Sequence, residues 1–168
     1  MWFNMDIVQN TEEGFIMRRL LLVVFLSGSF LLGSLYPIHA KDDPEAAKAM
    51  VEKAIAYYKA EGKEKAFSEI GDPNGRFMKG DLYVFVYDVK GAVIARPVQK
   101  GLIGKNIIDA KDGAGKLFVR ERLELAKTKG KGWQDYKFFN PTTKKMEDKR
   151  AWIETYDGYV FGCGAYKE

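Results

Sequence analysis

The sequence predicts an α+β fold in which one antiparallel sheet of about five strands packs against a long N-terminal helix. Two observations support this. Before Gly80, apolar residues recur at the three- and four-residue spacing of helices, whereas after it β-branched and aromatic residues form runs typical of strands. The helices and strands also do not alternate regularly, and this order favours an antiparallel sheet over a parallel one.

Two helices are expected before Gly80. Asp43 can cap the free N–H groups of a first turn and Pro44 suits the first helical position, so a helix is predicted over residues 43–60. Its apolar stripe consists of Ala47, Met50, Val51, Ala54, Ile55 and Tyr58. A second, short helix is predicted over residues 63–70, before a turn rich in glycine, aspartate and proline.

Five strands are expected after Gly80, and a third helix lies between the second and the third of them. The tight turn Asp157-Gly158 closes the last two strands into a hairpin. Residues 97–115 are interrupted by glycine and aspartate and are expected to be irregular, with the helix following over 117–128. The predicted strands are 81–88, 92–96, 132–139, 149–157 and 159–166.

The N-terminal region has the layout of a secretory signal. Arg18 and Arg19 precede a run of 21 residues without formal charge, which ends at Ala40. A basic start, an apolar centre and a small residue at the exit are the three parts of such a signal. The alternative is that the run remains as a membrane anchor, because its length is sufficient to span a bilayer.

This layout also divides the chain. We expect translation to begin at Met17, with residues 1–16 upstream of the natural start. Residues 17–40 are then the signal peptide, and residues 41–168 form a single domain in the periplasm or outside the cell. The membrane would be contacted only through the signal segment, if that segment is not cleaved.

Composition excludes several classes of function. The only histidine is His39, inside the predicted signal, and the only cysteine is Cys163. An internal disulfide, a Cys/His zinc site and a histidine-based triad are therefore excluded, and we expect no metal, no cofactor and no catalysis. The 27 Lys and Arg residues against 23 Asp and Glu are spread along the chain without a long block of one sign, so nucleic acid is not an expected partner.

Aromatic and basic residues supply the candidate ligand contacts. Tyrosine and tryptophan are denser than a core requires, and such side chains can line a pocket with apolar walls and polar tips. The aromatic candidates are Tyr83, Phe85, Trp133 and Tyr136. The basic residues that we expect to point inward are Arg76, Arg96 and Lys149.

An ordered set of segments resembles the single Cache domain family and covers nearly all of the predicted domain. Arg96 departs from the histidine that members of the family commonly have before this proline. The segments are Gly75–Asp88, Val93–Pro97, Leu102–Asn106, Asp112–Val119, Gly132–Tyr136, Lys149 and Gly162–Tyr166.

The resemblance implies a PAS-like, five-stranded antiparallel sheet with a long N-terminal helix, in an extracytoplasmic sensor of small molecules. Family ligands are often short organic acids, for which a basic residue is the expected partner. Lys149 is then expected to contact the carboxylate, with Tyr83, Phe85, Arg96, Trp133 and Tyr136 as its neighbours. Such domains usually belong to membrane receptors. Because the sequence ends shortly after the last predicted strand, we expect a stand-alone binder or an accessory to a separate receptor.

Two other functions remain open at this point. One is a structural or receptor-accessory module with no small ligand, for which a filled cavity and a solvent-exposed Lys149 would be typical. The other is a periplasmic enzyme that uses carboxylate or lysine chemistry, which turnover of a candidate ligand would reveal.

The signal layout generates a test. Mature protein is expected to begin at Lys41 and to be recovered in the soluble periplasmic fraction, because the apolar run would be cleaved after Ala40. N-terminal sequencing of protein from its own host checks this. Recovery of a chain that begins at Met17 in the membrane fraction would instead establish a tethered domain.

Overall fold

The computed structural model describes residues 43–140 and 142–167. The expected start at 1–16 and the signal at 17–40 lie outside the described residues and stay predictions. None of the helices in the described part has the length and hydropathy that a membrane crossing requires.

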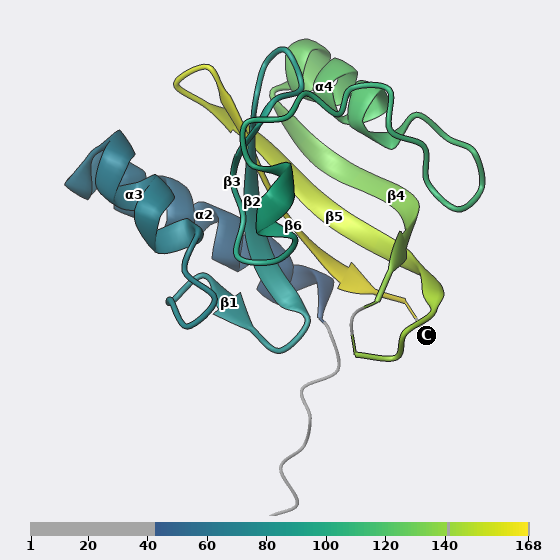
Figure 1. Ribbon diagram of the computed structural model, residues 1–168. Coiled ribbons are helices and arrows are strands. Elements are labelled where there is room, and N and C mark those ends of the chain that lie inside the picture. Colours follow the sequence, from purple (N-terminus) through teal and green to yellow (C-terminus); the bar gives the residue numbers. More distant parts are fainter. Residues whose placement is uncertain (1–42, 141, 168) are drawn as a thin grey trace, which may run out of the picture. The chain divides into compact units, whose positions relative to one another are not determined.

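A single antiparallel sheet forms the centre of the domain (Figure 1). The strands lie side by side in the order β1-β2-β6-β5-β4, and β3 pairs with β2. β6 therefore lies between β2 and β5, although it is the last of these strands in the chain. The strands are β1 (Met78–Lys79), β2 (Leu82–Asp88), β3 (Val93–Ala95), β4 (Lys131–Phe139), β5 (Met146–Tyr156) and β6 (Tyr159–Tyr166).

The five predicted strands are confirmed, and β1 is added to them. β1 has only two residues and pairs with the start of β2 across Gly80, too short a segment to have a recognisable strand pattern. β5 begins three residues earlier than predicted, at Met146. Its first residues are mostly charged and have low strand propensity, but they pair with the end of β4, where Met146 lies opposite Phe139.

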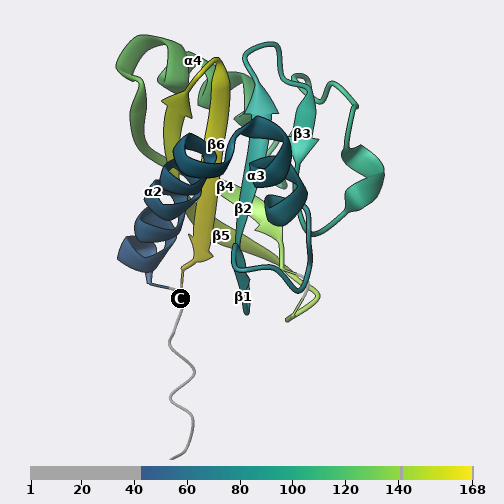
Figure 2. The ribbon, with the colours of Figure 1, turned by 90° about the vertical axis from the view of Figure 1, so that its left-hand side faces the viewer.

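Helices cover one face of the sheet. α2 (Pro44–Glu61) and α3 (Lys63–Ile70) pack there, as Figure 2 shows. Asp43 caps α2 as predicted, because its carboxylate accepts a hydrogen bond from the backbone N–H of Glu45 at 2.9 Å. In the predicted apolar stripe, Ala47, Val51 and Ala54 are completely buried, whereas Met50 is only partly buried.

The opposite face is covered by α4 (Phe118–Lys129) and by the irregular segment that precedes it. This segment includes one short 3₁₀ turn, η1 (Lys100–Leu102), and otherwise lacks regular structure, as the sequence predicts. The sheet is thus buried on both sides. The strand period of two residues places Val84 and Val86 toward α2 and Tyr83, Phe85 and Tyr87 toward α4.

Two glycines of β6 allow large side chains to lie flat across the centre of the sheet. A Cβ at Gly162 would lie 2.3 Å from Cε2 of Phe85 and 2.9 Å from Cδ1 of Ile153. A Cβ at Gly164 would lie 2.9 Å from Cε of Lys149. Glycine is therefore required at positions 162 and 164 of β6 by the side chains that the neighbouring strands place over them.

The contact at Gly162 generates a stability prediction. Gly162→Ala is expected to destabilise the domain by about 1–3 kcal/mol, because the ring of Phe85 must leave its place over β6. Gly101→Ala is the matched control, since a Cβ there has nothing within 4 Å. Urea denaturation measures both. Equal midpoints for the two variants would contradict the close packing at Gly162.

One hydrogen bond joins α2 to the turn between β5 and β6. The hydroxyl of Tyr58 donates to the carboxylate of Asp157 at 2.6 Å. Burial, followed by the hydrogen bond to Asp157, raises the pKa of Tyr58 to about 12 from an ordinary value near 10.

This shift predicts loss of stability at high pH. The folded state holds the Tyr58 proton more tightly than the unfolded state, so its contribution is complete below about pH 10 and is lost as the pH rises toward 12. Tyr58→Phe should lower stability at neutral pH by about 1 kcal/mol and flatten its decline between these values. The half-buried Tyr57→Phe is the control. Denaturation across the alkaline range checks this, and an unchanged slope in Tyr58→Phe would refute it.

Candidate ligand-binding site

A buried arginine lies beside a cavity on the α4 face of the sheet. Arg96 directly follows β3, is 2% exposed, and its Nε has no hydrogen-bond partner among the described residues. The cavity, about 280 Å³ in volume, lies between the sheet and the segment that leads from β3 to α4. Apart from Arg96, its wall includes Tyr87, Leu102, Ile107, Phe118 and Phe138. Burial of an arginine beside an open space is typical of a site for an anion.

A second cation lies in the layer of side chains next to this cavity. Lys149 extends from β5 across Gly164 and is 1% exposed. Its ammonium lies 4.5 Å from the ring centre of Tyr83 and 4.1 Å from that of Tyr166. It is also 5.9 Å from the ring of Phe138, which lines the cavity.

A third buried cation, Arg122 of α4, was not predicted. Its guanidinium is 1% exposed and is surrounded by four aromatic rings at 4.4–5.4 Å, those of Phe85, Tyr87, Phe118 and Tyr136. Its Nε donates to Gln134 at 3.0 Å, whereas one terminal nitrogen has no partner among the described residues. The sequence holds a signal for it, because Arg122 follows Phe118 by four residues and precedes Ala126 by four, on the buried stripe of the helix.

The charge balance of the interior is one-sided. Arg96 and Arg122 are buried, and no carboxylate is among the buried residues that the structure describes. Burial raises the pKa of the phenols of Tyr83, Tyr136 and Tyr166, although Arg96 opposes the shift at Tyr83 and Arg122 opposes it at Tyr136. The tyrosines therefore remain neutral and add no negative charge to the site.

The covering segment is tied to the edge strand β4 by one carboxylate. Asp112 accepts hydrogen bonds from the backbone N–H groups of Ala114, Lys116 and Lys137 at 2.8–3.0 Å. Partial burial alone would raise the pKa of Asp112, but these bonds outweigh it and the pKa is lowered. Lys116 also donates to the backbone carbonyl of Asp135 at 2.8 Å. These bonds hold the segment over the cavity.

Five of the six predicted site residues lie on this face of the sheet. Arg96 lines the cavity, and Lys149, Tyr83, Phe85 and Tyr136 form the adjoining layer.

Trp133 does not join them, and its predicted place beside Lys149 is wrong. It lies on the α2 face, with its ring centre 5.1 Å from that of Trp152. Trp133 and Tyr136 are three residues apart, so a regular strand must point them to opposite faces. Arg76, expected to point inward, is also exposed and pairs with Glu69.

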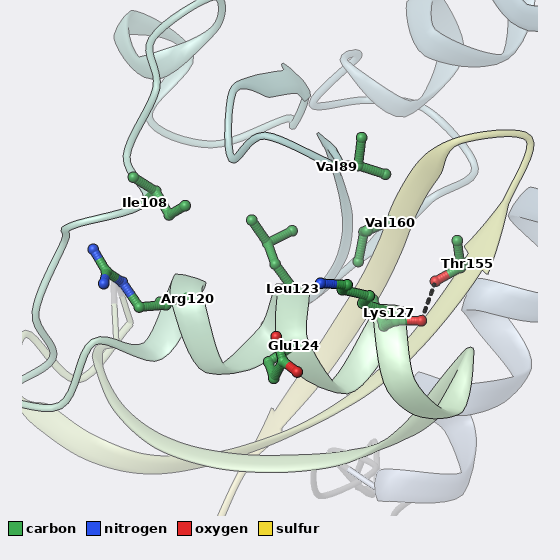
Figure 3. A pocket seen from close by; sticks show the side chains of 9 residues that line it. Val89, Ile108, Arg120, Leu123, Glu124, Lys127, Thr155 and Val160 are labelled. Carbon is green, nitrogen blue, oxygen red and sulfur yellow. Dashed lines mark hydrogen bonds between the residues drawn. The ribbon is translucent and has the colours of Figure 1, made fainter.

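A second hollow, of about 290 Å³, lies at the other end of α4 (Figure 3). Its wall includes Val89, Leu123 and Val160, and Figure 3 shows Arg120 at one side. Arg120 is largely exposed and pairs with Asp109 at 2.5 Å. Because the cations of this hollow are in contact with solvent, it lacks the buried charge that distinguishes the Arg96 cavity.

Comparison with known proteins gives one family and one curated relative. The family described as Single Cache domain 2 matches residues 45–168. The sensor histidine kinase MctS of Rhizobium johnstonii is 35% identical over 88 residues, which are 51% of this chain and 19% of that protein. The chain thus spans about a fifth of the length of this relative.

Three solved structures share the fold. A methyl-accepting chemotaxis protein from Vibrio parahaemolyticus aligns with a TM-score of 0.63 and 20% identity, covering 92% of this chain and 96% of that one. A periplasmic sensor domain of a chemotaxis protein aligns with a TM-score of 0.58 and 24% identity, over 74% and 90% of the two chains. A Cache chemosensory domain, described as recognising carboxylic acid, aligns with a TM-score of 0.59 and 18% identity, over 95% and 100%.

The helix-covered antiparallel sheet, the match over residues 45–168 and these structural neighbours agree with one another. The chain belongs to the single Cache domain 2 family of PAS-like sensor domains.

Proposed function

We propose that this chain is an extracytoplasmic sensor domain that binds a small organic acid without transforming it. The observation that carries the proposal is Arg96, a buried cation at a cavity wall whose Nε has no partner among the described residues. A buried charge is costly unless an opposite charge compensates it. A carboxylate in the cavity would supply that compensation.

The neighbouring side chains suit the same ligand. Lys149 adds a second positive charge next to the cavity, and Tyr83, Phe85 and Tyr136 reduce the access of water around it. Neutral phenols can donate hydrogen bonds to a carboxylate but cannot repel it. Charge-assisted hydrogen bonds contribute about 1.5–3 kcal/mol each, so one or two of them are enough to select acids over uncharged analogues.

The family supports the location and the partner. Its relatives include a periplasmic sensor domain and a sensor histidine kinase, and the predicted signal at 17–40 would direct this domain to the same side of the membrane. A membrane receptor is accordingly the proposed partner. The structural neighbour described as recognising carboxylic acid favours the same class of ligand.

Calorimetry with acetate, propionate, lactate and pyruvate tests the proposal. Saturable binding is expected, with a dissociation constant no lower than a few micromolar, because a ligand of about five non-hydrogen atoms contributes at most about 1.5 kcal/mol per atom. Arg96→Met should weaken binding by about tenfold or more, through loss of a charge-assisted contact. Lys149→Ala should also weaken it by about tenfold or more, through loss of a cation next to the cavity.

Arg76→Met is the matched control, because Arg76 is exposed and lies outside the cavity. Circular dichroism establishes that each variant is folded, and chromatography of the recovered ligand establishes that it is unchanged. If Lys149→Ala and Arg96→Met both bind the acid with the affinity of the parent protein, the carboxylate proposal is overturned. Conversion of the acid would make the protein an enzyme.

A further inference from the structure

The wall of the Arg96 cavity is apolar over most of its extent. Leu102, Ile107, Phe118 and Phe138 contribute hydrocarbon to it, whereas Arg96 contributes the buried charge. Such surfaces are complementary to hydrocarbon, since they offer no hydrogen bonds to a polar ligand.

Three other charged residues line the wall, of which Lys111 is exposed to solvent, whereas Asp112 and Lys137 have partners within the domain. Asp112 uses both carboxylate oxygens to accept backbone N–H groups. The ammonium of Lys137 donates to Asp148 at 2.9 Å. These groups therefore need no additional hydrogen bonds or charges from a ligand. The main polar group that the ligand must supply is one anionic group for Arg96.

The volume of the cavity exceeds that of the smallest acids. A space of about 280 Å³ corresponds to roughly nine water molecules at about 30 Å³ each. Acids of two or three carbons have roughly four to six non-hydrogen atoms and would leave a large part of this space to water, even at one water volume per atom. Replacement of poorly held water by hydrocarbon is favourable.

The mouth of the cavity is also apolar. Phe139 and Met146 face each other across β4 and β5 and both line the cavity. They are 41% and 50% exposed, which makes them two of the four large apolar side chains that are exposed in the described residues. A ligand that extended from Arg96 to the mouth would cover part of this surface.

We infer that the acid bound here carries an apolar body of about six carbon atoms, either a straight chain or an aromatic ring. Its carboxylate binds Arg96, its body contacts Phe118 and Phe138, and its far end reaches Phe139 and Met146. The inference rests on the proposed function, because it names the class of acid for the same cavity.

A chain-length series tests the inference. Calorimetry with acetate, butyrate and hexanoate is expected to show affinity rising about fourfold per methylene, the fold change that corresponds to about 0.8 kcal/mol for each buried CH₂. Benzoate should bind in the range of hexanoate. Hexanamide, which lacks the charge, should bind at least tenfold more weakly than hexanoate.

Variants separate the two ends of the ligand. Met146→Ser should lower the affinity for hexanoate severalfold and leave the affinity for acetate unchanged. Val89→Ser, at an exposed apolar residue outside the cavity, is the matched control and should change neither. Arg96→Met should lower the affinity for every acid in the series. If that variant does not fold, Arg96→Lys replaces it, since the lysine keeps the charge but loses the planar donor group and should still lower the affinity for each acid.

The outcomes distinguish the inference from the proposed function. If hexanoate binds no tighter than acetate while the Arg96 variant weakens both, the apolar body is disproved and acid binding stands. If no acid binds below the millimolar range, or if hexanamide binds as well as hexanoate, the proposed function fails and the inference fails with it.

Discussion

Buried positive charge determines which side chains can pack on the α4 face of the sheet. Arg96 and Arg122 are buried where the described interior has no carboxylate. Aromatic rings partly compensate the buried cations, because a desolvated cation over a ring face gains about 2 kcal/mol or more. The four rings around Arg122 and the tyrosines next to Lys149 are thus part of the electrostatics of the site as well as of its packing.

The two faces of the sheet consequently differ in kind. The α2 face is a packed core of aliphatic and aromatic side chains in which Val84, Val86 and Phe161 are completely buried. The α4 face combines cations, rings and a cavity, and its cover is partly irregular backbone held by Asp112. β2 contributes to both faces with alternate residues, so any shift of Tyr83 or Tyr87 is coupled through one strand to the residues that contact α2.

Local patterns were sufficient to predict most of the fold. The cap at Asp43, the turn at Asp157 and the change of period at Gly80 each have a short-range physical cause, and the predicted elements follow from them. The residues of the site were harder to predict from the sequence than the fold. Lys149 and Arg96 were correctly expected to point inward, but Trp133 was grouped with Tyr136 without regard to the alternation of a strand. Arg122 was missed because a charged residue on a helix is usually solvated, and only the four rings that gather around it from separate elements show otherwise.

The central position of β6 has a consequence for how the domain forms. β2 and β5 meet only through β6, whose pairing with β2 joins residues more than seventy positions apart in the sequence. Long-range pairing of this kind slows folding, because a large loop must close before the contacts stabilise it. In a nascent chain, β2 could therefore not be joined to β5 in one sheet until residues 159–166 have been synthesised.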